Sequence, residues 1–563
     1  MPYRAPAAEF RFILDQVVPL APVSASERFA EATSETVDAI LTEAARMCDE
    51  VMAPLNRASD LHPARLENGV LRSTPGFKEG FAAIREGGWV ALAAAEEFGG
   101  MGLPQAVNMA VNDMMSGACL SLQLNPLLTQ GQIEALEHHA SDEIKALYLP
   151  KLISGEWSGT MNLTEPQAGT DVGALRTKAE PNGDGSYAIT GQKIYISWGD
   201  SDLTENVCHL VLARLPDGAA GTRGISLFIV PKYLPDADGK PGQANSLSVV
   251  SLEHKMGLHG SPTCVMAYEG AQGWMVGGEH KGMAAMFTMM NNARLAVGVQ
   301  GIGIAEAAFQ KALDYAQERE QAGAIIQHAD VRRMLATMKA EIFAARSIAL
   351  ACAVALDLGR ASGDAEQSAR AALLTPIAKA YGTDVGCNVA ETGVQVHGGM
   401  GFIEETGAAQ FYRDVRVTTI YEGTNGIQAM DLVARKMADN GEAAARLLQE
   451  VEDFAHSARA MLPQLAEDTW LAAESLREAT EWLVHQEMQD RFAGAVPYLR
   501  AFARVLGAHY HLRAAVAEGG TGPRTDLARV YIRRLLPQYA ACLAEAKEGA
   551  AGLYALTPEV LHG

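Results

Sequence analysis

Several groups of residues resemble sequence motifs that bind cofactors or metals, and each motif would indicate a different class of protein. The segment GIGIAE, Gly301–Glu306, approaches the GxGxxG pattern that binds dinucleotide phosphates. Its sixth position is Glu and no strand precedes it, which favours close packing between helices. The pairs His138/His139 and His254/His259 lack the spacing of zinc sites and are typical of surface or hydrogen-bonded histidines. No metal site is predicted.

The remaining generic motifs are absent from the sequence. It contains neither a GxSxG nucleophile elbow nor a phosphate-binding GxxxxGK[ST] segment. Hydrolase, nucleotide triphosphatase and Rossmann dehydrogenase classes therefore lose their main support. With 46 Lys and Arg against 67 Asp and Glu, the net charge of −21 also argues against nucleic acid as a partner.

Composition indicates a globular protein outside the membrane. The 563 residues are 48% hydrophobic and 20% charged, enough for three or four domains. The longer apolar stretches, such as Ile225–Val230 and Ile348–Leu356, are too short to span a bilayer. The opening MPYRAPAAEFRF lacks the pattern of a signal peptide. Seven scattered cysteines without CxxC spacing predict reduced packing residues, so we expect a cytoplasmic protein.

The periodicity of apolar residues divides the chain into four parts. Helical spacing dominates up to about residue 156, with helices expected over 108–122 and 133–153 among others. Short β-prone runs separated by turn residues follow as far as 280, and 209–213 and 225–230 are two of the expected strands. Long helical patterns return and suggest a bundle, with Pro376 as an expected kink. We therefore predict a mainly α protein with a central β domain, and these domains: 1–156, N-terminal helical; 157–280, middle β; 281–440, four-helix bundle; 441–563, helical extension.

Six short segments occur in a fixed order across this helix–β–helix division. They are TEPQAGTD (164–171), GQKIYIS (191–197), KMGLHGSPTC (255–264), NNARL (291–295), QVHGGMGF (395–402) and IYEGTNGIQ (420–428). Each segment alone is a weak signal because glycine-rich turns are common. Together, over roughly residues 35–436, they resemble the acyl-CoA dehydrogenase family.

This resemblance implies the fold and the chemistry. The family has a helical N-terminal domain, a middle β-barrel and a C-terminal four-helix bundle, with FAD where they meet and across a subunit boundary. Its reaction is the α,β-dehydrogenation of an acyl-CoA thioester. A base removes the α-proton while the β-hydrogen leaves as hydride to flavin N5. We therefore expect FAD as cofactor, an acyl-CoA as substrate and a homo-oligomer, either dimer or tetramer.

Glu422 occupies the position that resembles the family's catalytic base. Apolar neighbours Ile420, Tyr421 and Ile427 would raise the pKa of its carboxyl group. The helix that begins after it would lower that pKa, because a helix N-terminus favours negative charge. The sequence alone leaves open which effect dominates. By resemblance, the backbone N–H of Glu422 also holds the thioester carbonyl, and Gly423 lets the backbone approach the ligand.

The resemblance further implies a set of FAD contacts. Thr164 and Thr170 match hydroxyl residues beside the flavin and its phosphate, and Tyr195 and Ser197 match positions that cover the ring and bond it near N5. The expected cofactor residues of the same subunit are Met161, Leu163, Thr164, Gly169, Thr170, Tyr195, Ile196, Ser197, Thr424 and Asn425.

Four further residues resemble those that reach the FAD of a neighbouring subunit. Arg319 matches an arginine that binds the pyrophosphate, and Gln395, Gly398 and Gly399 match a loop beside the adenosine diphosphate. The Phe-Gly usual after that arginine is replaced by Ala322 and Gly323, which puts the local loop geometry in doubt.

Substrate contacts are implied for Thr170, Asn291, Arg294, Tyr421 and Gly423. Arg294 matches an arginine near the pantetheine or adenine of CoA, although its expected acidic neighbour is Asn291 here. The opening segment, the EGTNG variant and the extension after 438 are most similar to a branch of the family that acts on 3-(methylthio)propanoyl-CoA, in DMSP catabolism. Short- or medium-chain acyl-CoA is the alternative substrate.

Two alternatives concern the fate of the electrons and the extension. We expect electron-transfer flavoprotein as acceptor, and an acyl-CoA oxidase, in which oxygen accepts the electrons, is the alternative. A non-enzymatic acyl-CoA-binding protein is the third possibility, against which an intact Glu422 and the FAD segments argue. The extension after Gly441 either covers the bundle or forms a dimer face.

Overall fold

The computed structural model describes residues 3–563, so the first two residues of the opening segment lie outside the described part. The chain forms two compact units. The first contains the residues up to Ala45, Pro104–Gly117 and Arg294–Gly563, and the second contains Arg46–Leu103 and Ala118–Ala293. We describe each unit separately. The four-domain division stays a prediction from sequence pattern.

The helices of the second unit precede and flank a β-domain. The stretch α6 (Gln105–His139) consists of two helices that meet at a kink, where the backbone of Cys119 is non-helical. The helices expected over 108–122 and 133–153 are therefore present, with different bounds. Pro54 does not end the preceding helix, because it lies in the first turn of α4, where no N–H is required. The other helices of this unit are α4 (Ala53–Leu61), α5 (Phe77–Glu86) and α7 (Asp142–Ile153). Helix α3 (Ser34–Met47) belongs to the first unit except for its last two residues.

A seven-stranded sheet forms the β-domain. Its strands are β3 (Trp157–Asn162), β4 (Lys178–Pro181), β5 (Tyr187–Ser197), β6 (Asn206–Arg214), β7 (Ile225–Pro231), β10 (Leu247–Leu252) and β11 (Thr263–Val276). Strand β7 pairs with both β6 and β11, which closes the ring β11–β5–β4–β6–β7 into a barrel. The predicted middle β-barrel is therefore confirmed. Two small hairpins lie outside the sheet: β1 (Arg65–Glu67) with β2 (Val70–Arg72), and β8 (Tyr233–Pro235) with β9 (Pro241–Ala244).

Burial explains which strands the sequence predicted. Every residue of β7 is buried, and β6 is buried except at its last residue, so both strands have continuous apolar runs. They pack on a core that includes Ile189, Phe228 and Met266. The polar strand β4 and the alternating strand β10 carry weaker patterns and were not predicted.

Long antiparallel helices form the bundle of the first unit. These are α8 (Gly282–Glu318), which belongs to this unit from Arg294 onward, α9 (Ala329–Ser362) and α10 (Ala365–His397). The shorter helices α11 (Ala408–Val415) and α12 (Asn425–Val433) follow. Helix α9 is long and apolar enough to cross a membrane, but 83% of its most apolar window is buried inside the protein. Its burial makes it the central helix of this bundle.

Glycines bring α8 and α10 unusually close together. A Cβ atom added at Gly298 would lie 2.6 Å from the carbonyl oxygen of Ala378, and one added at Gly382 would lie 2.6 Å from that of Gly298. One turn further along, Gly301 and Gly386 face each other in the same way. The GxG segment at 301–303 therefore serves helix packing, as predicted.

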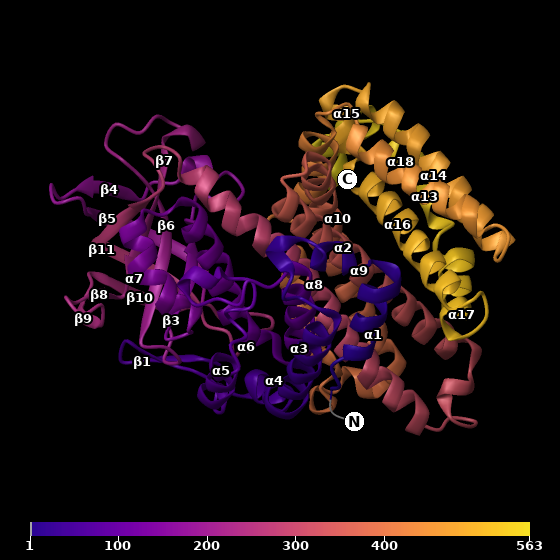
Figure 1. The fold of residues 1–563 in the computed structure, drawn as a ribbon, viewed down its shortest axis with the longest axis horizontal. Coiled ribbons are helices and arrows are strands. Elements are labelled where there is room, and N and C mark those ends of the chain that lie inside the picture. Colours follow the sequence, from indigo (N-terminus) through magenta and orange to yellow (C-terminus); the bar gives the residue numbers. More distant parts are fainter. Residues whose placement is uncertain (1–2) are drawn as a thin grey trace. The chain divides into compact units, whose positions relative to one another are not determined.

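The C-terminal extension packs on the bundle within the same unit (Figure 1). Helix α16 (Ala495–Ala517) lies against α9 and α12 and also contacts α10. The extension thus covers the bundle, which was one of the two predicted roles, and its role as a dimer face stays a prediction. Its other helices are α13 (Glu442–Ala458), α14 (Pro463–Val484), α15 (Met488–Ala493), α17 (Pro523–Val530), α18 (Gln538–Ala546), α19 (Ala551–Tyr554) and α20 (Pro558–His562).

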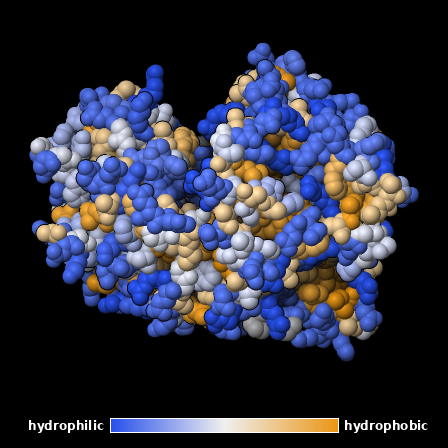
Figure 2. Space-filling view, viewed as in Figure 1, coloured by the Kyte–Doolittle hydropathy of each residue, from blue (hydrophilic) through white to orange (hydrophobic). Residues whose placement is uncertain are grey.

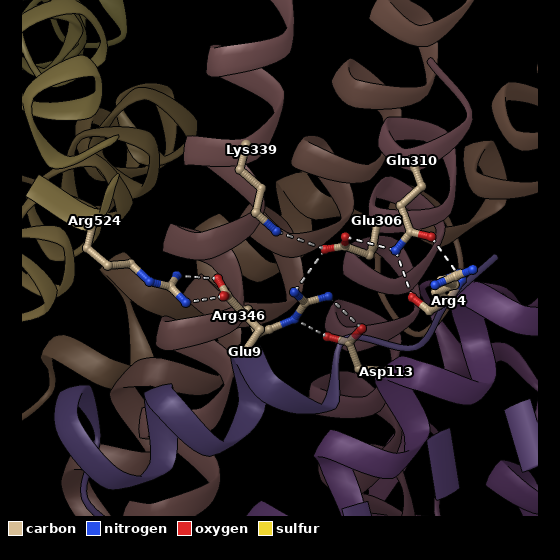
Figure 3. A network of polar contacts seen from close by, with 8 residues as sticks. All are labelled: Arg4, Glu9, Asp113, Glu306, Gln310, Lys339, Arg346 and Arg524. Carbon is tan, nitrogen blue, oxygen red and sulfur yellow. Dashed lines mark hydrogen bonds and ion pairs between the residues drawn. The ribbon is translucent and has the colours of Figure 1, made fainter. Parts of the chain in front are cut away.

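A buried polar network joins the N-terminal segment to the bundle and the extension (Figure 3). Arg346 of α9 donates two hydrogen bonds of 2.9 Å to Asp113 and one of 3.0 Å to Glu306. Helix α1 (Ala7–Phe12) supplies Glu9, which accepts a hydrogen bond of 2.8 Å from Arg524 of the extension. Arg4 and Gln310 hydrogen-bond through the Arg4 backbone. These contacts connect the N-terminal segment, the bundle and the extension within the first unit.

The surface and the cysteines agree with the composition. Hydrophilic residues cover most of the visible face, and hydrophobic residues are exposed there in separate patches (Figure 2). None of the seven cysteines forms a disulfide within residues 3–563, and five of them are buried. Burial raises the pKa of the Cys352 thiol to about 12, which keeps it protonated and unreactive. The prediction of reduced packing cysteines is confirmed.

Candidate active site

Glu422 lies in a loop with an unusual backbone. The loop connects the 3₁₀ turn Arg416–Thr419 to helix α12, and both Glu422 (φ 56°) and Gly423 (φ 86°) adopt the left-handed conformation. For a residue other than glycine this conformation costs about 1–3 kcal/mol and persists only where surrounding contacts hold it. The loop therefore requires specific contacts to keep its shape.

Side-chain hydrogen bonds supply these contacts. The Tyr421 hydroxyl donates to the side-chain oxygen of Gln300 on α8. The Gln428 amide donates to the carbonyl oxygens of Glu422 and Gly423, at 3.1 Å and 3.4 Å. Thr424 caps α12, since its hydroxyl accepts a hydrogen bond from the Ile427 backbone N–H. The strained pair is thus held from both ends.

The environment of Glu422 raises the pKa of its carboxyl group to near neutral pH. Burial raises the pKa of Glu422 to about 7, although the positive charges of Arg294 and Lys379 act to lower it. No donor among residues 3–563 hydrogen-bonds the carboxylate, and its backbone N–H has no acceptor among them either. Burial therefore outweighs these two positive charges. The group can accept a proton at neutral pH.

Arg294 is positioned on the buried side of α8. Its side chain is only 7% exposed, and its Nη1 lies 3.8 Å from Oδ2 of Asp431 on α12. Its charge therefore acts on both Asp431 and Glu422. Asn291, three residues earlier on the same helix, is exposed and belongs to the second unit. Contact of either residue with CoA stays a prediction.

In the second unit, a buried ion pair fixes the segment that follows β3. Lys193 is fully buried, and its Nζ donates to the Glu165 carboxylate at 2.8 Å and to the Leu163 carbonyl at 3.0 Å. The Ile194 backbone N–H donates to the Thr164 carbonyl at 2.9 Å. Although burial alone would raise it, the pKa of Glu165 falls to about 2 because of Lys193 and Thr177. The structure therefore brings Leu163 and Thr164 together with β5, the strand that carries Tyr195.

Tyr195 and Thr164 present groups that fit an aromatic cofactor. Tyr195 is 62% exposed and has a left-handed backbone (φ 60°), near the end of a strand in which only Ile189, Lys193 and Ile196 are buried. The Thr164 hydroxyl is half-buried and has no partner among residues 3–563. Ser197 is half-buried opposite Thr263 at the same strand end. Their exposed ring and hydroxyl groups fit the flavin of FAD, whereas Ile196 and Leu163 point into the core and could contribute only backbone groups.

The other predicted cofactor residues are on the surface. Gly169 and Thr170 are exposed in the loop after β3, and Met161 is half-buried within β3. Arg319 is exposed directly after α8, and the loop beyond it turns through left-handed Ala322 (φ 52°) and Gly323. Gln395, Gly398 and Gly399 are exposed at the end of α10. Their FAD contacts stay predictions.

The sequence did not identify the residues that hold the site in place. Gln300, Lys379 and Gln428 around Glu422, and Glu165 with Lys193 in the β-domain, are all buried polar groups. A buried Lys has no distinctive sequence pattern beyond a charge within an apolar helical stretch, as at Lys379.

Comparison with known protein families identifies the class. Four domain descriptions match in order: acyl-CoA dehydrogenase N-terminal domain (34–156), middle domain (160–271) and C-terminal domain (280–438), and acetyl-CoA dehydrogenase C-terminal like (447–557). The chain belongs to the acyl-CoA dehydrogenase family. It is therefore an enzyme that dehydrogenates acyl-CoA thioesters with FAD as cofactor.

Individual relatives extend this comparison over most of the chain. The 3-methylmercaptopropionyl-CoA dehydrogenase of Ruegeria pomeroyi is 45% identical over 89% of this chain and 88% of its own. A butyryl-CoA dehydrogenase of Syntrophomonas wolfei is 37% identical over 75% and 73%. The structure of Caenorhabditis elegans ACDH-11 in complex with C11-CoA has the same fold, with a TM-score of 0.81 and 20% identity over 95% of this chain and 92% of that chain.

Proposed function

We propose that this acyl-CoA dehydrogenase acts on 3-(methylthio)propanoyl-CoA, converts it to 3-(methylthio)acryloyl-CoA, and uses Glu422 as the general base. The observation that carries the role of Glu422 is a carboxylate held in a strained loop, without a hydrogen-bond donor and with its pKa raised to about 7. A surface carboxylate would be a much weaker base.

Glu422 removes the proton from the carbon next to the thioester carbonyl. The backbone N–H of the same residue lacks an acceptor among residues 3–563, so it is available to hold the carbonyl oxygen as negative charge develops there. FAD, when bound, supplies the hydride acceptor at flavin N5. Thr164, Tyr195 and Ser197 would hold and cover the flavin, and bound substrate would exclude water from the carboxylate.

The substrate proposal rests on likeness to relatives of known name. The relative named for 3-methylmercaptopropionyl-CoA shares 45% identity, whereas two butyryl-CoA dehydrogenases share 35% and 37% over a smaller part of the chain. Both substrate names describe short acyl chains. Butyryl-CoA is therefore the second candidate. Compared with the butyryl chain, the thioether chain is one atom longer, because a sulfur lies between carbon 3 and the terminal methyl group.

A series of acyl-CoA substrates tests this assignment. We expect kcat/KM to be highest for 3-(methylthio)propanoyl-CoA. The value for butyryl-CoA should be lower by about 10–200-fold, which is the effect of one methylene group on specificity. The measurement compares straight chains from about C3 to about C12 with the thioether under one set of conditions. A maximum at a long straight chain would overturn the substrate assignment and leave the reaction class intact.

We further propose electron-transfer flavoprotein as the electron acceptor. The alternative is an oxidase, in which oxygen takes the electrons and peroxide accumulates. Steady-state turnover with electron-transfer flavoprotein, against turnover in air with peroxide detection, separates the two. Stoichiometric peroxide without added acceptor would assign the oxidase activity instead.

We further propose that the protein is a cytoplasmic homo-oligomer. Met400, Phe402 and Ile403 are exposed beside Gly398 and Gly399, and Phe402 is 88% exposed. An apolar cluster of this kind favours cover by a second copy of the chain, which would bring Arg319 and Gln395 to the neighbour's FAD. Light scattering of the FAD-loaded protein should give a dimer or tetramer, and an F402D variant should weaken the assembly. A monomeric wild-type protein would contradict this.

A further inference from the structure

The first residue of α12, Asn425, makes a dense set of hydrogen bonds to α10. Its side-chain oxygen accepts from Nζ of Lys379 at 2.9 Å. Its side-chain nitrogen donates to Oδ1 of Asp384 at 2.7 Å and to the carbonyl oxygen of Ala380 at 3.2 Å. Both ends of the amide are therefore used, so any FAD contact of Asn425 would involve its backbone only.

These bonds lie directly beside the strained part of the loop. Glu422 and Gly423 are left-handed, and only Thr424 separates them from Asn425. On the other side, Tyr421 bonds Gln300 of α8. Because glycines bring α8 and α10 into backbone contact, the two anchors belong to one rigid pair of helices.

Lys379 is a costly residue to place here, because its side chain is completely buried. Burial lowers the pKa of Lys379 to about 8, opposed by the negative charges of Glu422 and Asp384. Its only hydrogen-bond acceptor among residues 3–563 is Asn425. A simple packing position would be filled by an apolar side chain, so the buried charge requires another explanation.

We propose that Lys379 and Asn425 are positioning residues: Asn425 fixes the Glu422 loop to α10, and the charge of Lys379 holds the Glu422 carboxylate in its ionised, proton-accepting form. This inference rests on the proposed role of Glu422 as base. It assigns to α10 the control of where the base lies and at which pH it works.

The electrostatic setting includes groups from every packed element. Arg294 of α8 and Lys379 of α10 act on Glu422 directly. Asp431 of α12 pairs with Arg294, and Asp384 of α10 is balanced by Arg500 of α16 and by Arg416. Removing the charge of Lys379 leaves Arg294 as the one nearby cation within residues 3–563 that acts on Glu422, so the carboxylate should become harder to ionise.

A pH profile of flavin reduction tests the charge. In wild type the rate should rise through the pKa of Glu422, near neutrality. K379Q should move this rising limb upward by about 1 pH unit, and K379R, which keeps the charge, should return it toward wild type. The matched control is K339Q, which removes a lysine charge from the same unit but from the network of Glu306. Coincident profiles for K379Q, K339Q and wild type would overturn the proposal.

An isosteric change tests the positioning. N425D places a carboxylate oxygen against Asp384 and the Ala380 carbonyl, where the amide nitrogen donated. We expect the single-turnover rate to fall by about 10²-fold, because a displacement of about 1 Å has an effect of that size. N388D, the same change at an exposed site on α10, should keep the wild-type rate. A wild-type rate in N425D would contradict the positioning role.

Two further measurements separate the possible failures. Infrared difference spectra between about pH 5 and about pH 9 report protonation of Glu422 without turnover, through the carboxyl band that E422Q abolishes. FAD absorbance and thermal unfolding show whether each variant is loaded and folded, and N425D and K379R remain informative if K379Q does not fold. If E422Q still reduces flavin at the wild-type rate, the proposed function fails. If E422Q is inactive and the band titrates identically in K379Q, only this inference fails.

Discussion

Two glutamates in the same unit show opposite responses to burial. Glu306 accepts hydrogen bonds from Arg346 at 3.0 Å and Gln310 at 3.1 Å, and Lys339 lies 3.7 Å away. Burial alone would raise its pKa, but these partners lower it to about 2. Glu422 also has two cations nearby, yet no donor among residues 3–563 contacts it, and burial raises its pKa to about 7. A buried carboxylate that accepts hydrogen bonds directly from its partners stays ionised at neutral pH. A carboxylate whose cations act only at longer range can exchange a proton there.

The largest expected effect comes from Glu422 itself. E422Q keeps the size of the side chain but removes the base, so kcat should fall by at least about 10²–10⁴-fold. Because no hydrogen bond to the carboxylate is lost, the free energy of unfolding should stay close to wild type. Single-turnover flavin reduction and chemical denaturation measure the two quantities. If E422Q remained active, Glu422 would not be the catalytic base, and its contrast with Glu306 would have no functional meaning.

Breaking the paired network should give the reverse pattern. R346M leaves Asp113 and Glu306 without their main partner in a buried site, which costs about 3–5 kcal/mol. At a temperature where R346M remains folded, its kcat should equal that of wild type, since the network holds the fold rather than the reacting groups. Urea denaturation checks the first value. A change below about 1 kcal/mol would mean that the network adds little.

The pH dependence of stability sharpens the contrast. The pKa of Glu306 and that of Glu165 are both lowered to about 2 in the folded protein, from 4.5 as the ordinary value. Their stabilising effect is therefore complete above about pH 4.5 and is lost as the pH falls toward about 2, by about 1.4 kcal/mol per pH unit for each proton bound. E306Q should remove the part due to Glu306. An unchanged acid slope in E306Q would contradict the pairing.

The glycine contact between α8 and α10 should give a moderate effect. G382A brings a methyl group to 2.6 Å from the Gly298 carbonyl, and such overpacking costs about 1–3 kcal/mol. G393A on the same helix meets nothing closer than 3.6 Å, so it should be neutral or slightly stabilising. Thermal unfolding of the two alanine variants checks the difference. Equal stability would show that the helices can separate without cost.

The smallest effect is expected at an exposed ion pair. Arg333 and Asp330 are 2.7 Å apart on α9, but both side chains are more than half exposed. R333A should change the free energy of unfolding by less than about 0.5 kcal/mol, because water solvates both charges when they are apart. Denaturation under the conditions used for R346M makes the comparison direct. A loss of several kcal/mol would show that exposure does not separate the two kinds of pair.

The sequence predicted the parts of the molecule that local pattern determines. Continuous apolar runs predicted β6 and β7, and the helical period predicted α9 and the helices of the extension. The motif around Glu422 located the base by resemblance. The bounds of the helices expected over 108–122 and 133–153 were wrong, because the kink lies at Cys119, a residue type that does not signal a break.

The contacts that give the site its properties depend on tertiary structure and had no local pattern. Lys379 is 46 residues away from Asn425, and Gln300 is 121 residues away from Tyr421. The pKa of Glu422 depended on two opposed effects whose balance required the actual burial of the carboxyl group. The packing of the N-terminal segment through Glu9 and Arg524 spans 515 residues and was likewise not predicted.

The close crossing at Gly298, Gly301, Gly382 and Gly386 also matters for anyone who wishes to alter what this enzyme oxidises. Random libraries that include these four codons would contain many destabilised variants, because even the smallest side chain pushes two backbones apart there. Randomised positions are better chosen among residues whose side chains are not at a contact between two backbones. Selection then reports on acyl-chain specificity and not on whether the variant folds.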